Sequence, residues 1–144
     1  MLVDASPNML REAKKRIPDA EAHYLFVLPT VFPGILQGRK FSIITANALF
    51  VHIPPDRAPG VLKAIRPLLT DEGVFFVNFK INDHSLISSD GRYFAYYRDA
   101  TMPEAMLRNA GFVIDEIALR SSERTMYGSM RRIQWANFYC RCPA

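Results

Sequence analysis

The chain has 144 residues and a formal net charge of +4, and 49% of its residues are hydrophobic while 22% are charged. This length and balance predict one soluble globular domain over residues 1–144 and argue against a disordered chain. The sequence contains no uncharged apolar run of about 18 residues, and its short, acidic start is unlike a signal peptide, so we expect no membrane-spanning helix and a cytoplasmic location.

A short strand and a capped helix open the chain. Residues 1–3 are apolar and end at Asp4, and Ser6 can cap a helix in which Pro7 takes the first position. Apolar residues then recur at helical spacing until Pro18 ends the pattern. The basic residues of this segment favour a solvated helix face over a nucleic-acid footprint, so nucleic acid is not an expected partner. They are Arg11, Lys14, Lys15 and Arg16.

Two strands are predicted next along the chain. Residues 23–28 are apolar and β-prone, and residues 29–38 contain two prolines, which predicts a loop with room for one helical turn. Residues 41–46 form the clearest strand, because they are rich in β-branched residues and nearly continuous in apolar character. Such a run is typical of a strand covered on both faces.

A second helix and a second buried strand follow. Asp56 is a candidate helix start, and Pro67 should shorten the last turn of that helix. A buried stripe is predicted on its inner side, made of Val61, Leu62, Ile65, Leu68 and Leu69. Residues 71–73 then predict a turn before a buried strand at residues 74–79.

The last third of the chain predicts a surface loop, a helix and two strands. Residues 82–92 are polar and form the loop, and residues 101–104 fit a capping box with Thr101 as the cap. The helix that follows should end at Gly111. Two final strands, at residues 112–119 and 133–140, could be antiparallel partners. Trp135, in the second of them, is expected to pack in the core.

Two cysteines, Cys140 and Cys142, lie near the end of the chain. In a strand they would point to the same face, where they are poorly placed to bridge each other. Further ligands at matching spacing are not evident, so we expect reduced thiols and no metal site.

Helical patterns alternate with buried strands over most of the chain. This alternation predicts an α/β fold with a mostly parallel sheet, helices on both faces and C-terminal strands that are partly antiparallel. An acid at the carboxyl end of a strand, just before a capped helix, suits recognition of ribose hydroxyls. Asp4 holds such a position, but it could equally well cap the helix beside Ser6.

Four segments resemble class I S-adenosylmethionine-dependent methyltransferases. VDASPNMLREA at residues 3–13 resembles the part that follows the family's glycine-rich turn. FSIITANALFVHIP at residues 41–54 is similar to the fourth strand and its turn, and LKAIRPLLTDEGVF at residues 62–75 is similar to the next helix, turn and strand. AGF at residues 110–112 matches the last helix–strand junction. The resemblance implies a Rossmann-like fold and methyl transfer from S-adenosylmethionine to an acceptor, which we expect to be a small molecule.

The resemblance also implies which residues would bind the cofactor. Asp4 would hold the ribose hydroxyls, and Ala5 would lie beside the adenosine. Ala46 and Asn47 would lie near the methionine part, mainly through their backbone groups, and Leu28 would pack against adenine.

Three departures from the family's pattern shape a second interpretation. The sequence has no G-x-G-x-x-G pattern, and it has no Asp or Glu between His23 and Pro55, where the family usually places an acid for the adenine amino group. Ser42 stands where the family often has an acid. We therefore expect an N-terminally truncated, partial methyltransferase-like domain. The alternative function is that of a truncated, non-catalytic scaffold or partner-binding module.

Substrate-side candidates come from the predicted carboxyl edge of the sheet, where open α/β sheets bind ligands. His52 could act as a base near the transferred methyl group, although a turn histidine bonded to backbone is the favoured interpretation. Arg92, Tyr93 and Tyr97 are the other candidates, with aromatic packing and a solvated arginine as the alternative. No residue is assigned as catalytic, since methyl transfer to a good nucleophile needs mainly proximity and alignment.

The family's sheet places its first strand between the second and the fourth. Without that strand, residues 1–4 would pair directly with residues 41–46, or an exposed sheet edge would remain. An exposed edge favours association of two copies, so a homodimer is an expected partner arrangement.

Overall fold

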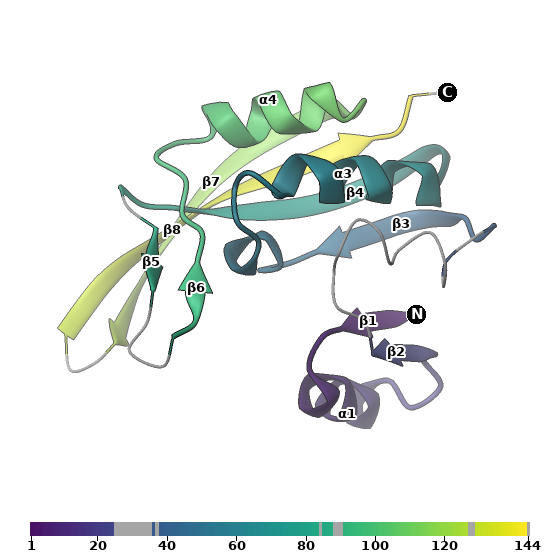
Figure 1. Ribbon diagram of the computed structural model, residues 1–144, viewed down its shortest axis with the longest axis horizontal. Coiled ribbons are helices and arrows are strands. Elements are labelled where there is room, and N and C mark those ends of the chain that lie inside the picture. The colour runs from purple at the N-terminus through teal and green to yellow at the C-terminus, as the bar shows by residue number, and fades with distance from the viewer. Residues whose placement is uncertain (25–35, 37, 84, 88–90, 127–128, 144) are drawn as a thin grey trace. The chain divides into compact units, whose positions relative to one another are not determined.

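The computed structural model describes residues 1–24, 36, 38–83, 85–87, 91–126 and 129–143 of the chain (Figure 1). These residues fall into two compact units, Met1–Gln37 and Gly38–Ala144. No helix in the described part of the chain is long and apolar enough to span a membrane.

The N-terminal unit contains strand β1 (Leu2–Asp4), helix α1 (Pro7–Arg16) and strand β2 (Ala22–Tyr24). β1 and β2 pair in parallel, with Leu2 opposite Ala22. The Ser6 hydroxyl accepts a hydrogen bond from the Met9 amide at 3.3 Å, and Pro7 opens the helix, as the sequence predicts. Only the first part of the predicted strand at residues 23–28 can be compared, because residues 25–28 lie outside the described residues.

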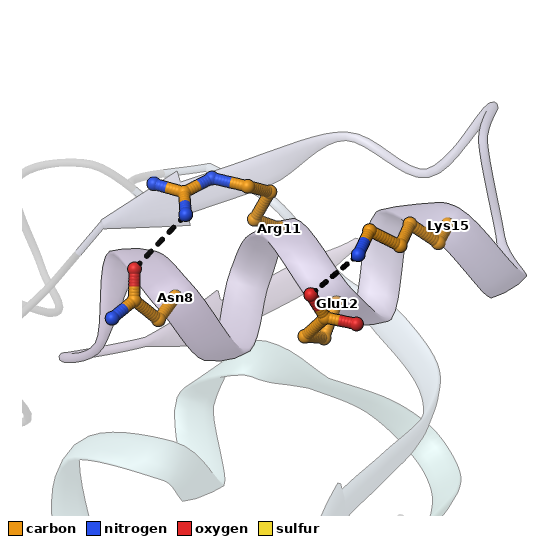
Figure 2. A network of polar contacts seen from close by, with 4 residues as sticks. All are labelled: Asn8, Arg11, Glu12 and Lys15. Atoms are coloured by element: carbon orange, nitrogen blue, oxygen red, sulfur yellow. Dashed lines mark hydrogen bonds and ion pairs between the residues drawn. The ribbon is translucent and has the colours of Figure 1, made fainter.

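Helix α1 carries polar contacts and buries none of its residues. Figure 2 shows that the Lys15 ammonium donates to the Glu12 carboxylate at 2.6 Å and that the Arg11 guanidinium donates to the Asn8 amide at 3.1 Å. The basic residues of this helix are all exposed, as a solvated helix face requires. Exposed pairs of this kind contribute little to stability.

The C-terminal unit is built on a four-stranded sheet. It contains β3 (Phe41–Ala46), β4 (Leu69–Ile81), β7 (Val113–Met126) and β8 (Ser129–Arg141), in the spatial order β3-β4-β8-β7. β3 and β4 are parallel, whereas β8 is antiparallel to both β4 and β7. The predicted antiparallel pairing of the last two strands is therefore confirmed.

Two helices cover one face of this sheet. α3 (Ala58–Ile65) and α4 (Thr101–Asn109) lie on the same side in Figure 1, and the sheet residues that alternate toward one face are fully buried: Phe75, Val77, Phe79, Ala136, Phe138 and Cys140. The predicted apolar stripe is buried. α3 ends at Ile65, and the 3-10 turn η2 (Arg66–Leu68), which contains Pro67, follows it, so the helix is shortened there as expected.

β3 is only half covered, so the prediction that both of its faces are buried is wrong. Ser42 and Thr45 are exposed, and Ile43 keeps 64% of its surface. β3 is the end strand of the four-stranded order. Trp135 is likewise half-buried instead of lying in the core. Ala136 and Phe138 take the buried face of β8, so Trp135, one position before Ala136, lies on the opposite face. An apolar run shows that a segment is hydrophobic, but it does not show which neighbouring elements cover each face of the strand.

The expected turn at residues 71–73 lies inside β4. The pairing with β3 jumps from Phe41 opposite Leu69 to Ile43 opposite Val74, so the extra residues bulge out of the ladder. Glu72 takes a left-handed φ of 61° at this bulge. A Cβ on Gly73 would lie 2.8 Å from the Thr70 carbonyl oxygen, which explains why the position needs glycine.

The start of α4 corrects the predicted capping box. Thr101 lies inside the helix, and its backbone N–H donates to the Asp99 carboxylate at 2.8 Å. That hydrogen bond lowers the pKa of Asp99. Glu104 instead pairs with Arg108 one turn later, at 2.8 Å. The helix starts one residue too early for a Thr101 cap. Ala100 is its N-cap residue, and the Ala100 carbonyl accepts the Glu104 N–H at 2.9 Å, which is the donor that the Thr101 hydroxyl would have capped. Gly111, with φ of 87°, follows the helix as predicted.

The polar segment after β4 contains a small hairpin, β5 (Leu86–Ile87) and β6 (Tyr93–Phe94). A 3-10 turn, η1 (Phe50–His52), follows β3. Among the described strands, β1 pairs with β2 and β3 pairs with β4 in separate sheets. The expected direct pairing of residues 1–4 with residues 41–46 stays a prediction, as does association through an exposed edge.

Candidate functional site at the carboxyl ends of β3 and β4

The carboxyl end of β3 meets the middle of β4. Ala46 is the last residue of β3, is buried, and lies opposite Val77. Asn47 follows and is exposed. Ala48 then adopts a left-handed φ of 54°, which turns the chain toward η1. This places Asn78 of β4 beside the turn that follows β3.

Asn78 joins the two segments through its amide. Its Oδ1 accepts a hydrogen bond from the Ala48 N–H at 2.7 Å, and its Nδ2 donates to Oδ1 of Asn47 at 2.6 Å. Asn78 is 6% exposed and is the one buried polar side chain in the described part of the chain. Both of its polar atoms have partners, as burial demands.

Sequence analysis missed Asn78 as a site residue. The available signal was the single amide in the apolar run Val74-Phe75-Phe76-Val77-Asn78-Phe79. A polar residue in a buried strand needs a hydrogen-bond partner. The partner of Asn78 is Asn47, which lies 31 positions earlier at the end of the neighbouring parallel strand, so it could not be identified without knowing how the strands pair.

The segment around β6 packs at the same edge. The Ala95 N–H donates to the Val51 carbonyl at 2.7 Å, and the Tyr97 N–H donates to the Lys80 carbonyl at 2.9 Å. The exposed His52 ring lies 5.4 Å from the ring of Phe94, centroid to centroid. The structure thus brings three predicted substrate-side residues to one region: His52, Tyr93 and Tyr97. Arg92, next to Tyr93, is exposed.

Tyr97 lies deeper than a substrate contact would require. Its ring meets Phe79 edge to face with centroids 5.2 Å apart, and its buried hydroxyl has no hydrogen-bond partner among the residues that the structure describes. Burial raises the pKa of this hydroxyl well above its ordinary value, and the neighbouring Tyr93 adds to the rise. The geometry favours aromatic packing for Tyr97, and its substrate role stays a prediction.

Lys80 brings positive charge to this edge. Its ammonium donates to the Tyr96 hydroxyl at 3.2 Å and lies 4.6 Å from the centroid of that ring. Lys80 follows Asn78 by two positions in β4, so both side chains project from the same face of the strand.

The N-terminal unit holds the other predicted cofactor residues. Oδ1 of Asp4 accepts the Ser6 N–H at 2.7 Å, which is the turn-capping role, while Oδ2 accepts no hydrogen bond from the described residues. Ala5 is exposed beside it. Leu28 lies outside the described residues, so its predicted contact with adenine remains a prediction.

The cysteines are free and buried. Burial raises the pKa of the Cys140 thiol to about 12, and the Asp115 carboxylate contributes. A thiol of that pKa is a poor nucleophile and a poor metal ligand near neutral pH. The described residues contain no group of three or more His, Cys, Asp or Glu side chains arranged to hold a metal ion.

Comparison with known proteins gives a result at the level of structure. No family model and no curated protein sequence matches the chain. A solved S-adenosylmethionine-dependent methyltransferase from Methanosarcina mazei is similar with a TM-score of 0.69 at 11% identity, over 98% of this chain and 80% of that one. One from Clostridium acetobutylicum gives 0.66 at 16% identity, over 99% and 74%.

A third solved structure is similar and carries a ligand. The 1,6-didemethyltoxoflavin-N1-methyltransferase of Burkholderia thailandensis, solved with S-adenosylhomocysteine, gives a TM-score of 0.67 at 18% identity. The match covers 99% of this chain and 60% of that one. At such identities the likeness establishes architecture. The chain has the fold of the class I S-adenosylmethionine-dependent methyltransferases.

Proposed function

We propose that this chain binds S-adenosylmethionine and transfers its methyl group to a small-molecule acceptor in the cytoplasm. The observation that carries the proposal is the likeness to methyltransferases over nearly the whole chain, including one solved with S-adenosylhomocysteine. Because function depends on the site as well as on the fold, the residues must also suit the cofactor.

The available polar groups suit different parts of that cofactor. Oδ2 of Asp4 can accept from a ribose hydroxyl, and the end of β3, where Ala46 is buried and Asn47 is exposed, offers backbone groups to the methionine part. When bound, S-adenosylmethionine supplies an electrophilic methyl group on its sulfonium. The chain's own residues then have to hold the acceptor in line and keep water away.

The substrate side of the site is assigned to His52, Arg92 and Tyr93. His52 and Arg92 are exposed and Tyr93 is half-buried, so these side chains are accessible beside η1 and β6. An exposed imidazole can accept a proton from an acceptor nucleophile. We assign His52 the role of general base for acceptors whose nucleophilic group has a high pKa.

Isothermal titration calorimetry with S-adenosylhomocysteine tests cofactor binding, with ATP as a control ligand that shares the adenosine. We expect saturable binding of S-adenosylhomocysteine with one site per chain and no comparable binding of ATP. Absence of saturable binding would overturn the proposal and support the non-catalytic alternative. Transfer of labelled methyl groups from S-adenosylmethionine to a panel of small nucleophiles then identifies the acceptor.

The second candidate is a partner-binding module that associates through β3. β3 is the end strand of its sheet, and Ile43 on it is 64% exposed. An apolar end strand is a ready surface for pairing between copies. Sedimentation velocity should then show a homodimer that the Ile43→Lys substitution converts to a monomer. A wild-type chain that is monomeric at all concentrations would contradict this candidate.

A further inference from the structure

One backbone N–H fixes the orientation of two side-chain amides at the end of β3. The Ala48 N–H can only donate, so the Asn78 atom that it meets at 2.7 Å must be the carbonyl oxygen. The Asn78 Nδ2 is then committed to the other side, where it donates to Asn47 at 2.6 Å. The atom of Asn47 that receives this hydrogen bond must be its oxygen.

This relay decides what Asn47 offers to a ligand. With Oδ1 held by Asn78, the remaining polar group of Asn47 is its Nδ2, a pure donor. Nδ2 donates to no residue in the described part of the chain, and Asn47 is exposed. The Asn47 side chain therefore presents an N–H donor, which matches an acceptor oxygen and not an ammonium.

The same contacts hold the backbone in place. The left-handed φ of Ala48 is unfavourable for a residue with a Cβ, and its N–H bond to the buried Asn78 offsets that cost. Lys80, which projects from the same face of β4 as Asn78, adds positive potential. Donor groups and positive charge together favour a carboxylate.

We propose that the Asn47 amide donates to the carboxylate at the amino-acid end of the cofactor, and that Asn78 is the positioning residue that fixes this polarity. The inference rests on the proposed function, since it assigns a contact within that site. It goes beyond the backbone contacts expected at the end of β3, because it gives the Asn47 side chain a defined partner.

A comparison of two ligands isolates this contact. S-adenosylhomocysteine carries the carboxylate, whereas 5′-methylthioadenosine lacks the entire amino-acid part. Both are titrated by calorimetry into the full chain and into the variants Asn47→Ala and Asn78→Asp. Asn137→Asp is the matched control, because Asn137 lies directly opposite Asn78 on β8 and has no hydrogen bond to Asn47.

Asn47→Ala should weaken S-adenosylhomocysteine about 10- to 100-fold, the range for a hydrogen bond to a charged group. Binding of 5′-methylthioadenosine should stay within about twofold, since the lost donor faces a group that this ligand lacks. Asn78→Asp should produce the same selective loss. An ionised carboxylate accepts the Ala48 N–H but cannot donate, so the Asn47 amide must turn over and present its oxygen.

The outcomes separate the two proposals. Equal weakening of both ligands by Asn47→Ala, or no weakening of either, overturns the assigned contact while leaving cofactor binding intact. A wild-type chain that binds neither ligand overturns the proposed function and this contact together. Asn47 is exposed, so Asn47→Ala decides the contact even if Asn78→Asp fails to fold. Selective loss in the Asn137→Asp control would overturn the positioning role of Asn78.

Discussion

The two units of the chain differ in how they are stabilised. In the described part of residues 1–37, Leu36 is buried, while α1 buries none of its residues. In Gly38–Ala144, aromatic side chains fill the space between the sheet and its two helices, and Phe50, Phe75, Phe79 and Phe138 are fully buried. Hydrophobic burial dominates folding stability, so among the described residues those of the C-terminal unit supply most of it. The N-terminal unit contributes a candidate ligand group, Asp4.

Truncation of a core ring in the C-terminal unit should have the largest effect. Phe79 is fully buried and its ring lies within about 6 Å, centroid to centroid, of three other rings, as close aromatic packing allows. We expect Phe79→Ala to lower the free energy of unfolding by about 3–5 kcal/mol. Urea unfolding followed by circular dichroism measures the change.

Met9 in α1 provides the matched control for this comparison. Its side chain is 59% exposed, so Met9→Ala should change the free energy of unfolding by no more than about 0.5 kcal/mol. If Met9→Ala cost as much as Phe79→Ala, the contrast between the units would be wrong.

Asp4 tests what the N-terminal unit contributes to binding. Replacing Asp4 with Ala removes the free carboxylate oxygen and should weaken S-adenosylhomocysteine by about 1–3 kcal/mol, the range for hydrogen bonds to a charged group. Calorimetry measures the affinity, with the exposed Glu12→Ala in the same unit as a control for loss of negative charge. Unchanged affinity in Asp4→Ala would remove Asp4 from the site.

Tyr97 offers a smaller effect of opposite sign. Its buried hydroxyl has no hydrogen-bond partner in the described part of the chain, and an unsatisfied buried polar group is costly. Tyr97→Phe should therefore raise the free energy of unfolding by about 1 kcal/mol. Thermal and urea unfolding test this gain, and a clear loss of stability would mean that the hydroxyl is satisfied in solution.

Titration of the Cys140 thiol should change stability only at alkaline pH. Burial raises the pKa of its thiol from 9.0 to about 12 in the folded chain. Above pH 9 the unfolded chain loses this proton while the folded chain keeps it, so this contribution to stability falls as the pH rises from about 9 toward 12. The stability difference between wild type and Cys140→Ala should therefore shrink over that interval. A difference that stays constant with pH would contradict the assignment.

Local signals in the sequence predicted much of the fold. The Ser6-Pro7 start of α1, the buried stripe of α3 and the end of α4 at Gly111 each depend on residues within one or two turns. Such neighbours interact in almost any context. The pairing of β7 with β8 followed from two adjacent apolar stretches joined by a polar connection.

Features that depend on distant partners could not be predicted in the same way. The exposure of Ile43 follows from the end position of β3, which an apolar run does not encode. The capping box at Thr101 is a local error instead, because the helix begins with Ala100 as its N-cap residue and the Ala100 carbonyl accepts the Glu104 N–H. The Asn47–Asn78 pair required knowledge of which strands are neighbours and in what register.

Nuclear magnetic resonance of the ¹⁵N-labelled chain during titration with S-adenosylhomocysteine tests the central claim most directly. The account predicts that the largest shift changes occur at the Ala46 and Asn47 backbone amides and at the side-chain NH₂ of Asn47, with a further change at Asp4. Saturating ligand that leaves these resonances unmoved, or that moves only resonances elsewhere, would contradict a cofactor site at the end of β3.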